Sequence, residues 1–179
     1  TPDQRKLAMF PLDSAERTQW NFIPDEAFRR SGIQMKALTP AQRKLAYALL
    51  QTGLSERGYM TYTGIMELET VLKAVEESAR RSGGAVAAGA APPGGGQPAE
   101  GTSPAQQFTR DPLHHHLSIF GTPGTDTVWG WRLEGHHISL NFTVVKGRLV
   151  RAAPTFAGTN PAEVKDGKAQ EAFGEAKSG

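Results

Sequence analysis

The chain has 179 residues and contains no cysteine. Disulfide bonds, thiolate metal ligands and cysteine nucleophiles are therefore excluded. The sequence also lacks any run of about 18 apolar residues, so it predicts no membrane-spanning helix. The sequence also has no large excess of one charge. It contains 20 Lys and Arg residues and 18 Asp and Glu residues, and the two kinds are interspersed along the chain. Nucleic-acid binding is therefore not expected.

The N-terminus has neither an initial methionine nor a charged and then apolar leader, since the first residue is Thr1. This start is typical of a processed or trimmed chain. We expect a periplasmic or secreted location rather than a cytoplasmic one. The length fits one domain, or a helical part joined to a β part, and the oligomeric state stays open.

Residues 1–81 are predicted to be mainly helical. The start Thr-Pro-x-Gln occurs at Thr1 and again at Thr39, with a hydroxyl cap and a proline in the first turn. For the second helix start we place Arg43 at the third helical position, where an ideal capping box has Glu. This helix is expected to end at Gly53. Another helix is expected to begin after Ser55, and apolar residues at helical spacing predict that it occupies about 62–81. The two helices are expected to form a hairpin. The charged residues of the later helix are predicted to form its solvated face: Glu67, Glu69, Lys73, Glu76 and Glu77.

The remaining chain changes character twice. Residues 82–106 are dense in Gly, Ala and Pro, and this composition predicts a flexible linker. Residues 107–166 are predicted to form an antiparallel β part, with strands at 114–120, 129–133, 136–145 and 148–153, and residues 167–179 a polar tail. The predicted fold class is α+β: a helical hairpin packed on an antiparallel sheet, with a long Gly/Ala/Pro-rich linker.

The stretch from Val128 to Val145 carries the most informative pattern. With strand alternation, Ile138, Leu140 and Phe142 share one face and form core. The opposite face carries His137, Ser139 and Asn141, and Gly135 is expected to form a bulge that brings His136 beside His137. This polar row predicts a cleft. The candidate catalytic residues are Glu134, His136, His137, Ser139 and Asn141.

A metal site is predicted from three histidines. His114 and His116 are two positions apart, so on one strand they point to the same side about 7 Å apart. Pairing of strands could add His137 as a third nitrogen ligand for Zn²⁺, Cu²⁺ or Fe²⁺. Such a site with an open position generates hydroxide from water. The alternative is an exposed strand entry, with a neutral His137 hydrogen-bonded in a packed sheet.

Three neighbouring side chains are candidate ligand contacts: Trp129, Trp131 and Arg132. The tryptophans share a strand face and would form a wall for an apolar or sugar-like ligand, or pack in the core. Arg132 and Glu134 also share a face and would form an ion pair, unless Glu134 is a buried acid or base. Ser139 lacks the G-x-S-x-G elbow of a serine hydrolase.

Three motifs carry a family resemblance. They are S-x-F-G-x-P at 118–123, W-G-W-R-x-E-G-H-H-x-S-L-N at 129–141, and P-x-F-x-G-x-N-P-A at 154–162. With them, the sequence resembles the bacterial family called domain of unknown function 3500 (DUF3500) over most of residues 18–166. The resemblance implies no established activity. Family members look longer, with a further helical portion and a later histidine-containing segment. Either a site built from both halves is incomplete here, or that segment lies outside the given sequence.

These patterns together predict a protein with a histidine-rich polar cleft. The leading hypothesis is a metal-assisted hydrolase or oxidoreductase acting on a small organic substrate. The alternative is a noncatalytic ligand-binding or interaction module, in which the tryptophans and the polar row hold a small molecule. Metal content distinguishes the two.

Overall fold

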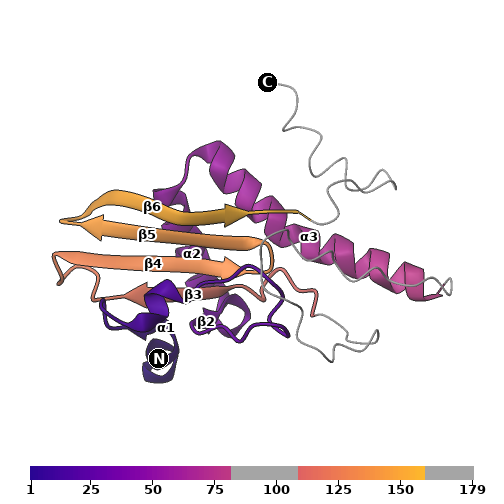
Figure 1. Cartoon of the computed structure of the whole chain (residues 1–179), viewed down its shortest axis with the longest axis horizontal. Coiled ribbons are helices and arrows are strands. Elements are labelled where there is room, and N and C mark those ends of the chain that lie inside the picture. The colour runs from indigo at the N-terminus through magenta and orange to yellow at the C-terminus, as the bar shows by residue number, and fades with distance from the viewer. Residues whose placement is uncertain (82–108, 160–179) are drawn as a thin grey trace.

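The computed structural model describes residues 1–81 and 109–159 (Figure 1). The N-terminal range forms α1 (Pro2–Ala8), β1 (Met9–Phe10), the 3-10 turn η1 (Ala15–Thr18), β2 (Ile33–Gln34), the 3-10 turn η2 (Met35–Ala37), α2 (Pro40–Gly53) and α3 (Glu56–Arg81). The later range forms β3 (His116–Phe120), β4 (Val128–Gly135), β5 (Ile138–Val145) and β6 (Arg148–Ala157). The predicted α+β class is confirmed. The linker predicted at 82–106 and the tail predicted at 167–179 lie outside the described residues.

The strands form one mixed sheet in the order β1-β3-β4-β5-β6, with β2 also paired to β3. Strands β3 to β6 run antiparallel to their neighbours, whereas the short β1 runs parallel to β3. The β4–β5 hairpin is paired from Val128↔Val145 to Gly135↔Ile138. All four strand regions predicted for the β part are present.

The hairpin turn between β4 and β5 corrects one prediction. The predicted strand over 136–145 begins only at Ile138, and Gly135 is the last residue of β4 rather than a bulge. His136 and His137 form the turn, and His137 has a positive φ of 64°. His137 therefore does not continue the alternating row of Ser139 and Asn141.

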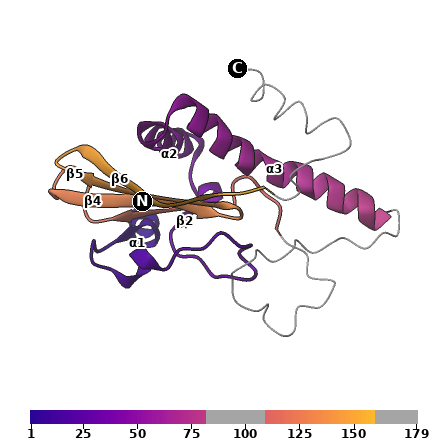
Figure 2. The same ribbon diagram turned by 45° about the horizontal axis from the view of Figure 1, so that its top comes forward.

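One face of the sheet is apolar and packs against α2 and α3 (Figure 2). The β-strand register places Trp131 opposite Phe142 and Leu133 opposite Leu140, and these side chains lie on this face. Leu50 of α2 and Ile65 of α3 belong to the same buried cluster. The predicted burial of Ile138, Leu140 and Phe142 is confirmed, because none is more than 2% exposed.

Capping boxes start both α1 and α2. Thr39 accepts from the backbone of Gln42, and the Gln42 side chain accepts from the backbone of Thr39. The third helical position is therefore Gln42 and not Arg43, because Pro40 is the first helical residue. Gln4 plays the same part in α1, and the two glutamines hydrogen-bond each other. This contact joins the two helix starts. The later helix, α3, begins at Glu56, directly after Ser55 as predicted.

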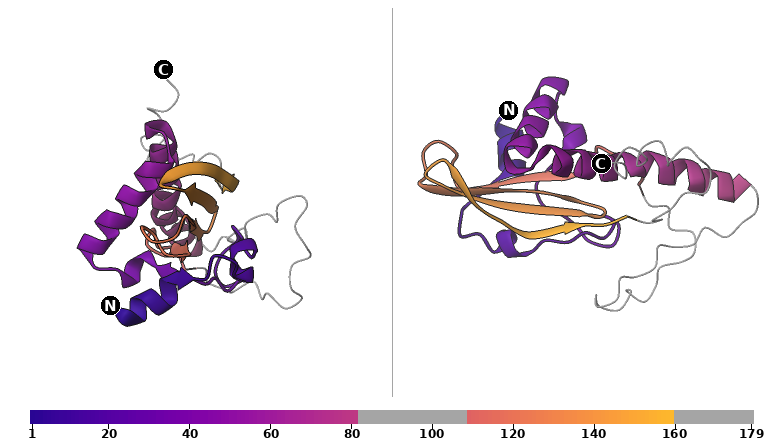
Figure 3. Two further views of the ribbon diagram at one scale, coloured as in Figure 1. Left: turned by 90° about the vertical axis from the view of Figure 1, so that its left-hand side faces the viewer. Right: turned by 90° about the horizontal axis from the view of Figure 1, so that it is seen from above.

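The other face of the sheet is polar, and the segment 11–32 covers it (Figure 3). Arg17 donates to Thr143 of β5 at 2.7 Å, and Arg132 of β4 pairs with Glu16. The backbone N–H of Asn21 donates to Glu134. The sheet thus lies between a helical layer and an N-terminal layer, and its polar side chains are buried beneath the latter.

Candidate functional site

The two tryptophans of the predicted site lie on the apolar face. Trp131 is 2% exposed and stacks on Phe142 with ring centroids 4.1 Å apart. Trp129 is partly buried against the same core. The sheet therefore separates both rings from Ser139 and Asn141, which lie on the opposite face.

Ser139 and Asn141 form a buried polar pair beneath the N-terminal layer. The Asn141 amide donates to Ser139 Oγ at 3.1 Å and to the carbonyl of Pro154 at 2.8 Å. Ser139 is completely buried. Both donors of the Asn141 amide thus have partners within the sheet.

The ion pair predicted between Arg132 and Glu134 is present, with 3.2 Å between Nε and Oε2. Glu134 is completely buried and also faces Arg30 at 3.5 Å. Burial raises the pKa of Glu134, while the charges of Arg132 and Arg30 oppose that rise. Two arginines and the N–H of Asn21 surround this carboxyl, so the geometry gives it a role in holding the layers together.

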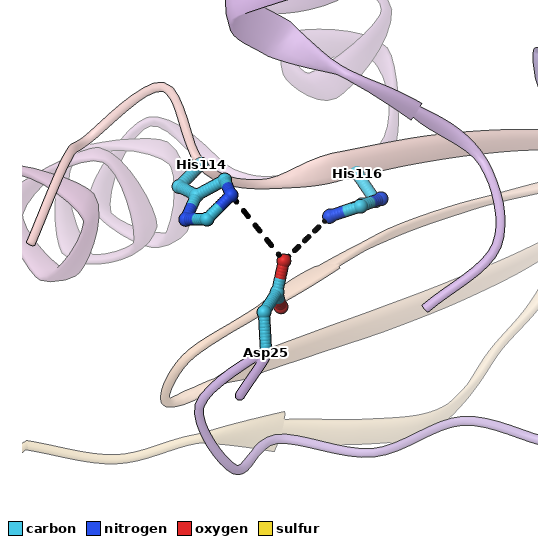
Figure 4. A group of neighbouring side chains, drawn as sticks. All are labelled: Asp25, His114 and His116. Atoms are coloured by element: carbon cyan, nitrogen blue, oxygen red, sulfur yellow. Dashed lines mark hydrogen bonds and ion pairs between the residues drawn. The ribbon is translucent and has the colours of Figure 1, made fainter. Parts of the chain in front are cut away.

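His114 and His116 come together with a residue that the sequence pattern did not single out, Asp25 (Figure 4). Their Nε2 atoms lie 3.6 Å and 2.8 Å from the same carboxylate oxygen, Oδ2. The ligand atoms of all three residues lie within 4.8 Å of one another. The predicted common side of His114 and His116 is thus present, and this group contains Asp25 rather than His137.

The second carboxylate oxygen of Asp25, Oδ1, is bound by an arginine. The buried Arg30 guanidinium contacts Oδ1, while Oδ2 faces the imidazoles. Burial raises the pKa of Asp25, but the hydrogen bond from His116 and the charge of Arg30 outweigh it and lower that pKa to about 2. Burial lowers the pKa of His114. A charged carboxylate and a neutral imidazole are the forms in which these groups bind metals.

A second cluster joins α3 to the hairpin turn. Glu69 Oε1 lies 2.5 Å from His136 Nδ1, and Arg110 Nη1 lies 3.5 Å from Glu69 Oε2. Arg110 also pairs with Glu76 at 2.7 Å. The prediction that Glu69 belongs to a solvated face is wrong, because it is 3% exposed. Burial raises the pKa of Glu69, and the hydrogen bond from His136 and the charges of His136 and Arg110 outweigh it, so the pKa is lowered.

His137 lies beside this cluster. Its ring centroid is 3.7 Å from that of His136, and its backbone N–H donates to the carbonyl of Phe22 at 2.7 Å. Burial, followed by the charge of His136, lowers the pKa of His137 to about 4. The residue is thus a neutral part of the turn that contacts the N-terminal layer.

The two clusters open into one small pocket. Its walls include Asp25 and His114 of the first cluster and Glu69, Arg110 and His136 of the second. The cavity volume is about 10 Å³, which is roughly the space that one water molecule needs. The pocket therefore suits an ion or a water more than an organic molecule.

The comparison with family models decides the family. A model described as "Protein of unknown function (DUF3500)" matches residues 1–176. The chain belongs to the DUF3500 family. The resemblance seen in the sequence motifs is thereby confirmed. No curated protein and no solved structure matches this DUF3500 chain. Among the described residues, α3 and the other helices are all too short or too polar to cross a membrane.

Sequence reasoning on this DUF3500 chain missed Asp25 and Glu69 for different reasons. Asp25 lies 91 positions from His116 in a segment without regular structure, so no spacing rule connects them. Glu69 did carry a signal. It is four positions after Ile65 and three before Leu72, so the helical period places it on the buried stripe of α3.

Proposed function

We propose that the protein binds a divalent transition metal ion through Asp25, His114 and His116. The convergence of two imidazole Nε2 atoms on one carboxylate oxygen, at 2.8 Å and 3.6 Å, carries this proposal. A metal about 2.0–2.2 Å from each ligand atom keeps those atoms roughly 3–4 Å apart. Small side-chain rotations would bring the three ligands to that spacing.

Two imidazoles, one carboxylate and an open position form the ligand set of catalytic zinc sites and of non-haem iron sites. We favour zinc and hydrolysis, because the adjoining cavity has room for about one water and an activated water is the reactant that zinc supplies. The substrate would be a small organic molecule at the mouth of the pocket. Iron or copper would favour an oxidoreductase instead.

The surroundings of the ligands support moderate rather than very tight binding. Arg30 orients the carboxylate through Oδ1, as partners of metal ligands do. Coordination through His116 Nε2 moves the ring proton to Nδ1, a buried atom that has no hydrogen-bond partner among residues 1–81 and 109–159. This missing contact lowers the expected affinity.

A noncatalytic function is the alternative, and two contacts of Asp25 favour it. Asp25 already pairs with Arg30 and His116, so the group can act as an ion-paired network that ties the N-terminal layer to β3. The chain would then be a ligand-binding or interaction module. The two functions differ in metal content.

Metal binding is tested with protein purified without nickel resin. We expect elemental analysis to find close to one zinc per chain. Titration calorimetry should show that His114→Gln and Asp25→Asn weaken zinc binding by roughly 100-fold or more, since each removes a direct ligand. The matched control is His137→Gln, which alters an imidazole outside the group.

The outcomes separate the hypotheses. Loss of zinc in His137→Gln with retention in Asp25→Asn would make His137 the third ligand. A folded wild-type protein that binds no zinc, copper or iron would reject the metal site and leave the ion-paired network.

A further inference from the structure

We propose that His136, oriented by Glu69, accepts a proton from the water activated at the Asp25, His114 and His116 site. This inference rests on the proposed metal function and adds the group that takes the proton. Glu69 is a positioning residue, because it acts through the imidazole.

The hydrogen bond between Glu69 and His136 fixes the tautomer. Nδ1 of His136 lies 2.5 Å from Glu69 Oε1 and 3.0 Å from Arg110 Nη1. Because a carboxylate only accepts hydrogen bonds, the shorter contact places the proton on Nδ1, which donates it to Glu69. The neutral ring then has its lone pair on Nε2. A carboxylate bound to Nδ1 is also the arrangement that prepares the histidine of hydrolytic triads to act as a base.

The walls of the pocket are mainly acidic. Its walls carry the carboxylates of Asp25, Glu26, Glu69 and Asp111 against the single guanidinium of Arg110. Arg110 lies 3.0 Å from His136 Nδ1 and also pairs with Glu69 and Glu76. Carboxylates thus outnumber cations on the walls of the pocket, and this excess attracts a metal cation. An anionic substrate would be repelled.

The position of His136 connects it to the metal site. The tight turn after Gly135 presents the ring at the end of the sheet, where the residues just before β3 place His114 at the same cavity. Both His136 and His114 line this cavity of about 10 Å³, which has roughly the space of one water. In the step, one O–H bond of this water breaks, the proton moves to His136 Nε2, and the electron pair stays on the oxygen.

The test uses zinc-loaded full-length protein and 4-nitrophenyl acetate as a neutral ester probe. His136→Gln should retain zinc affinity within about threefold and lose roughly 100-fold in kcat, the usual contribution of a general base, with KM unchanged. Added imidazole should restore part of the kcat. Glu69→Gln should lower kcat by about tenfold without changing KM, because the base remains but is less well oriented.

Glu77→Gln is the matched control, since it neutralises an exposed carboxylate of α3 that does not line the pocket, and its kcat should equal that of the wild type. Absence of zinc in the wild-type protein would reject the metal function and this step together. Stoichiometric zinc without ester hydrolysis, or full kcat in His136→Gln, would reject only the proton acceptor. A loss in His136→Gln that imidazole does not restore would also reject it, since the effect would then be structural.

Discussion

The three consecutive histidines occupy different environments because side chains alternate along a strand. His114 and His116 point to Asp25, whereas His115 points to the opposite face and is 1% exposed. Its Nδ1 lies 3.0 Å from the carbonyl of Pro112, and its ring packs on Gly135. The middle histidine is therefore part of the core, although the same residue type next to it is a metal ligand candidate.

His115 predicts a pH dependence of stability. Burial lowers its pKa from 6.5 to about 4 in the folded protein, so between these values the unfolded chain binds a proton that the folded chain does not. Stability is full above the higher value and falls as the pH drops, by about 3 kcal/mol near the lower value. Urea unfolding of the wild type and of His115→Gln at several pH values measures this loss. Parallel pH curves for the two proteins would contradict the assignment.

The close packing around Gly135 predicts that one added methyl group lowers the stability of the protein. A Cβ there would lie 2.4 Å from Cδ2 of the buried His115 ring, so Gly135→Ala should lower the free energy of unfolding by about 1–3 kcal/mol. Gly64→Ala is the matched control, because no atom lies within 4 Å of its added Cβ. This variant should stabilise α3 by about 0.5–1 kcal/mol. Urea unfolding that gives both variants the same sign of change would contradict the close packing at Gly135.

At the scale of elements, the polar face of the sheet depends on the N-terminal layer. Arg132 is 1% exposed, and its guanidinium is held by the Glu16 carboxylate and by backbone carbonyls of the same segment. Burial of such a charge is tolerated only while its partners remain in place. Strand β4 and the 3-10 turn η1 are therefore coupled through one ion pair.

This coupling predicts the effect of removing one partner. Glu16→Ala leaves Arg132 buried with an incomplete set of acceptors, so it should destabilise the protein by about 3 kcal/mol. Replacing both residues, as in Glu16→Ala with Arg132→Met, should recover part of this loss, because the guanidinium without its acceptor is removed and the buried Glu134 keeps Arg30 as a partner. Denaturant unfolding of the single and double variants provides the measurement. A single variant within about 0.5 kcal/mol of the wild type, the range of ordinary surface changes, would show that the pair is dispensable.

Several elements were predictable from the sequence because local rules determine them. Alternation gave the apolar face of β5, and the Thr-Pro-x-Gln pattern gave the start of α2. The turn at His136 and His137 was not predictable in this way, since neither residue is a usual turn former and a positive φ, as at His137, is uncommon outside glycine. Because strand alternation does not indicate this turn, the predicted polar row includes His137, which in the structure belongs to the turn.

At the scale of the whole molecule, the candidate site lies where distant segments of the chain meet. Asp25 comes from the N-terminal layer, His114 from the entry to β3, Glu69 from the helical layer and His136 from the turn of the β4–β5 hairpin. The histidines could be proposed from sequence because they are close to one another in the chain. The carboxylates could not be joined to them, because only the assembled layers bring them to one cavity.

The measurement that tests the central claim most directly is an anomalous difference map at the zinc absorption edge from crystals of the protein grown with zinc. The account predicts one peak about 2.0–2.2 Å from Nε2 of His114, Nε2 of His116 and Oδ2 of Asp25. A peak coordinated elsewhere, or an Asp25 carboxylate that stays bound to His116 with no peak beside it at saturating zinc, would contradict the claim.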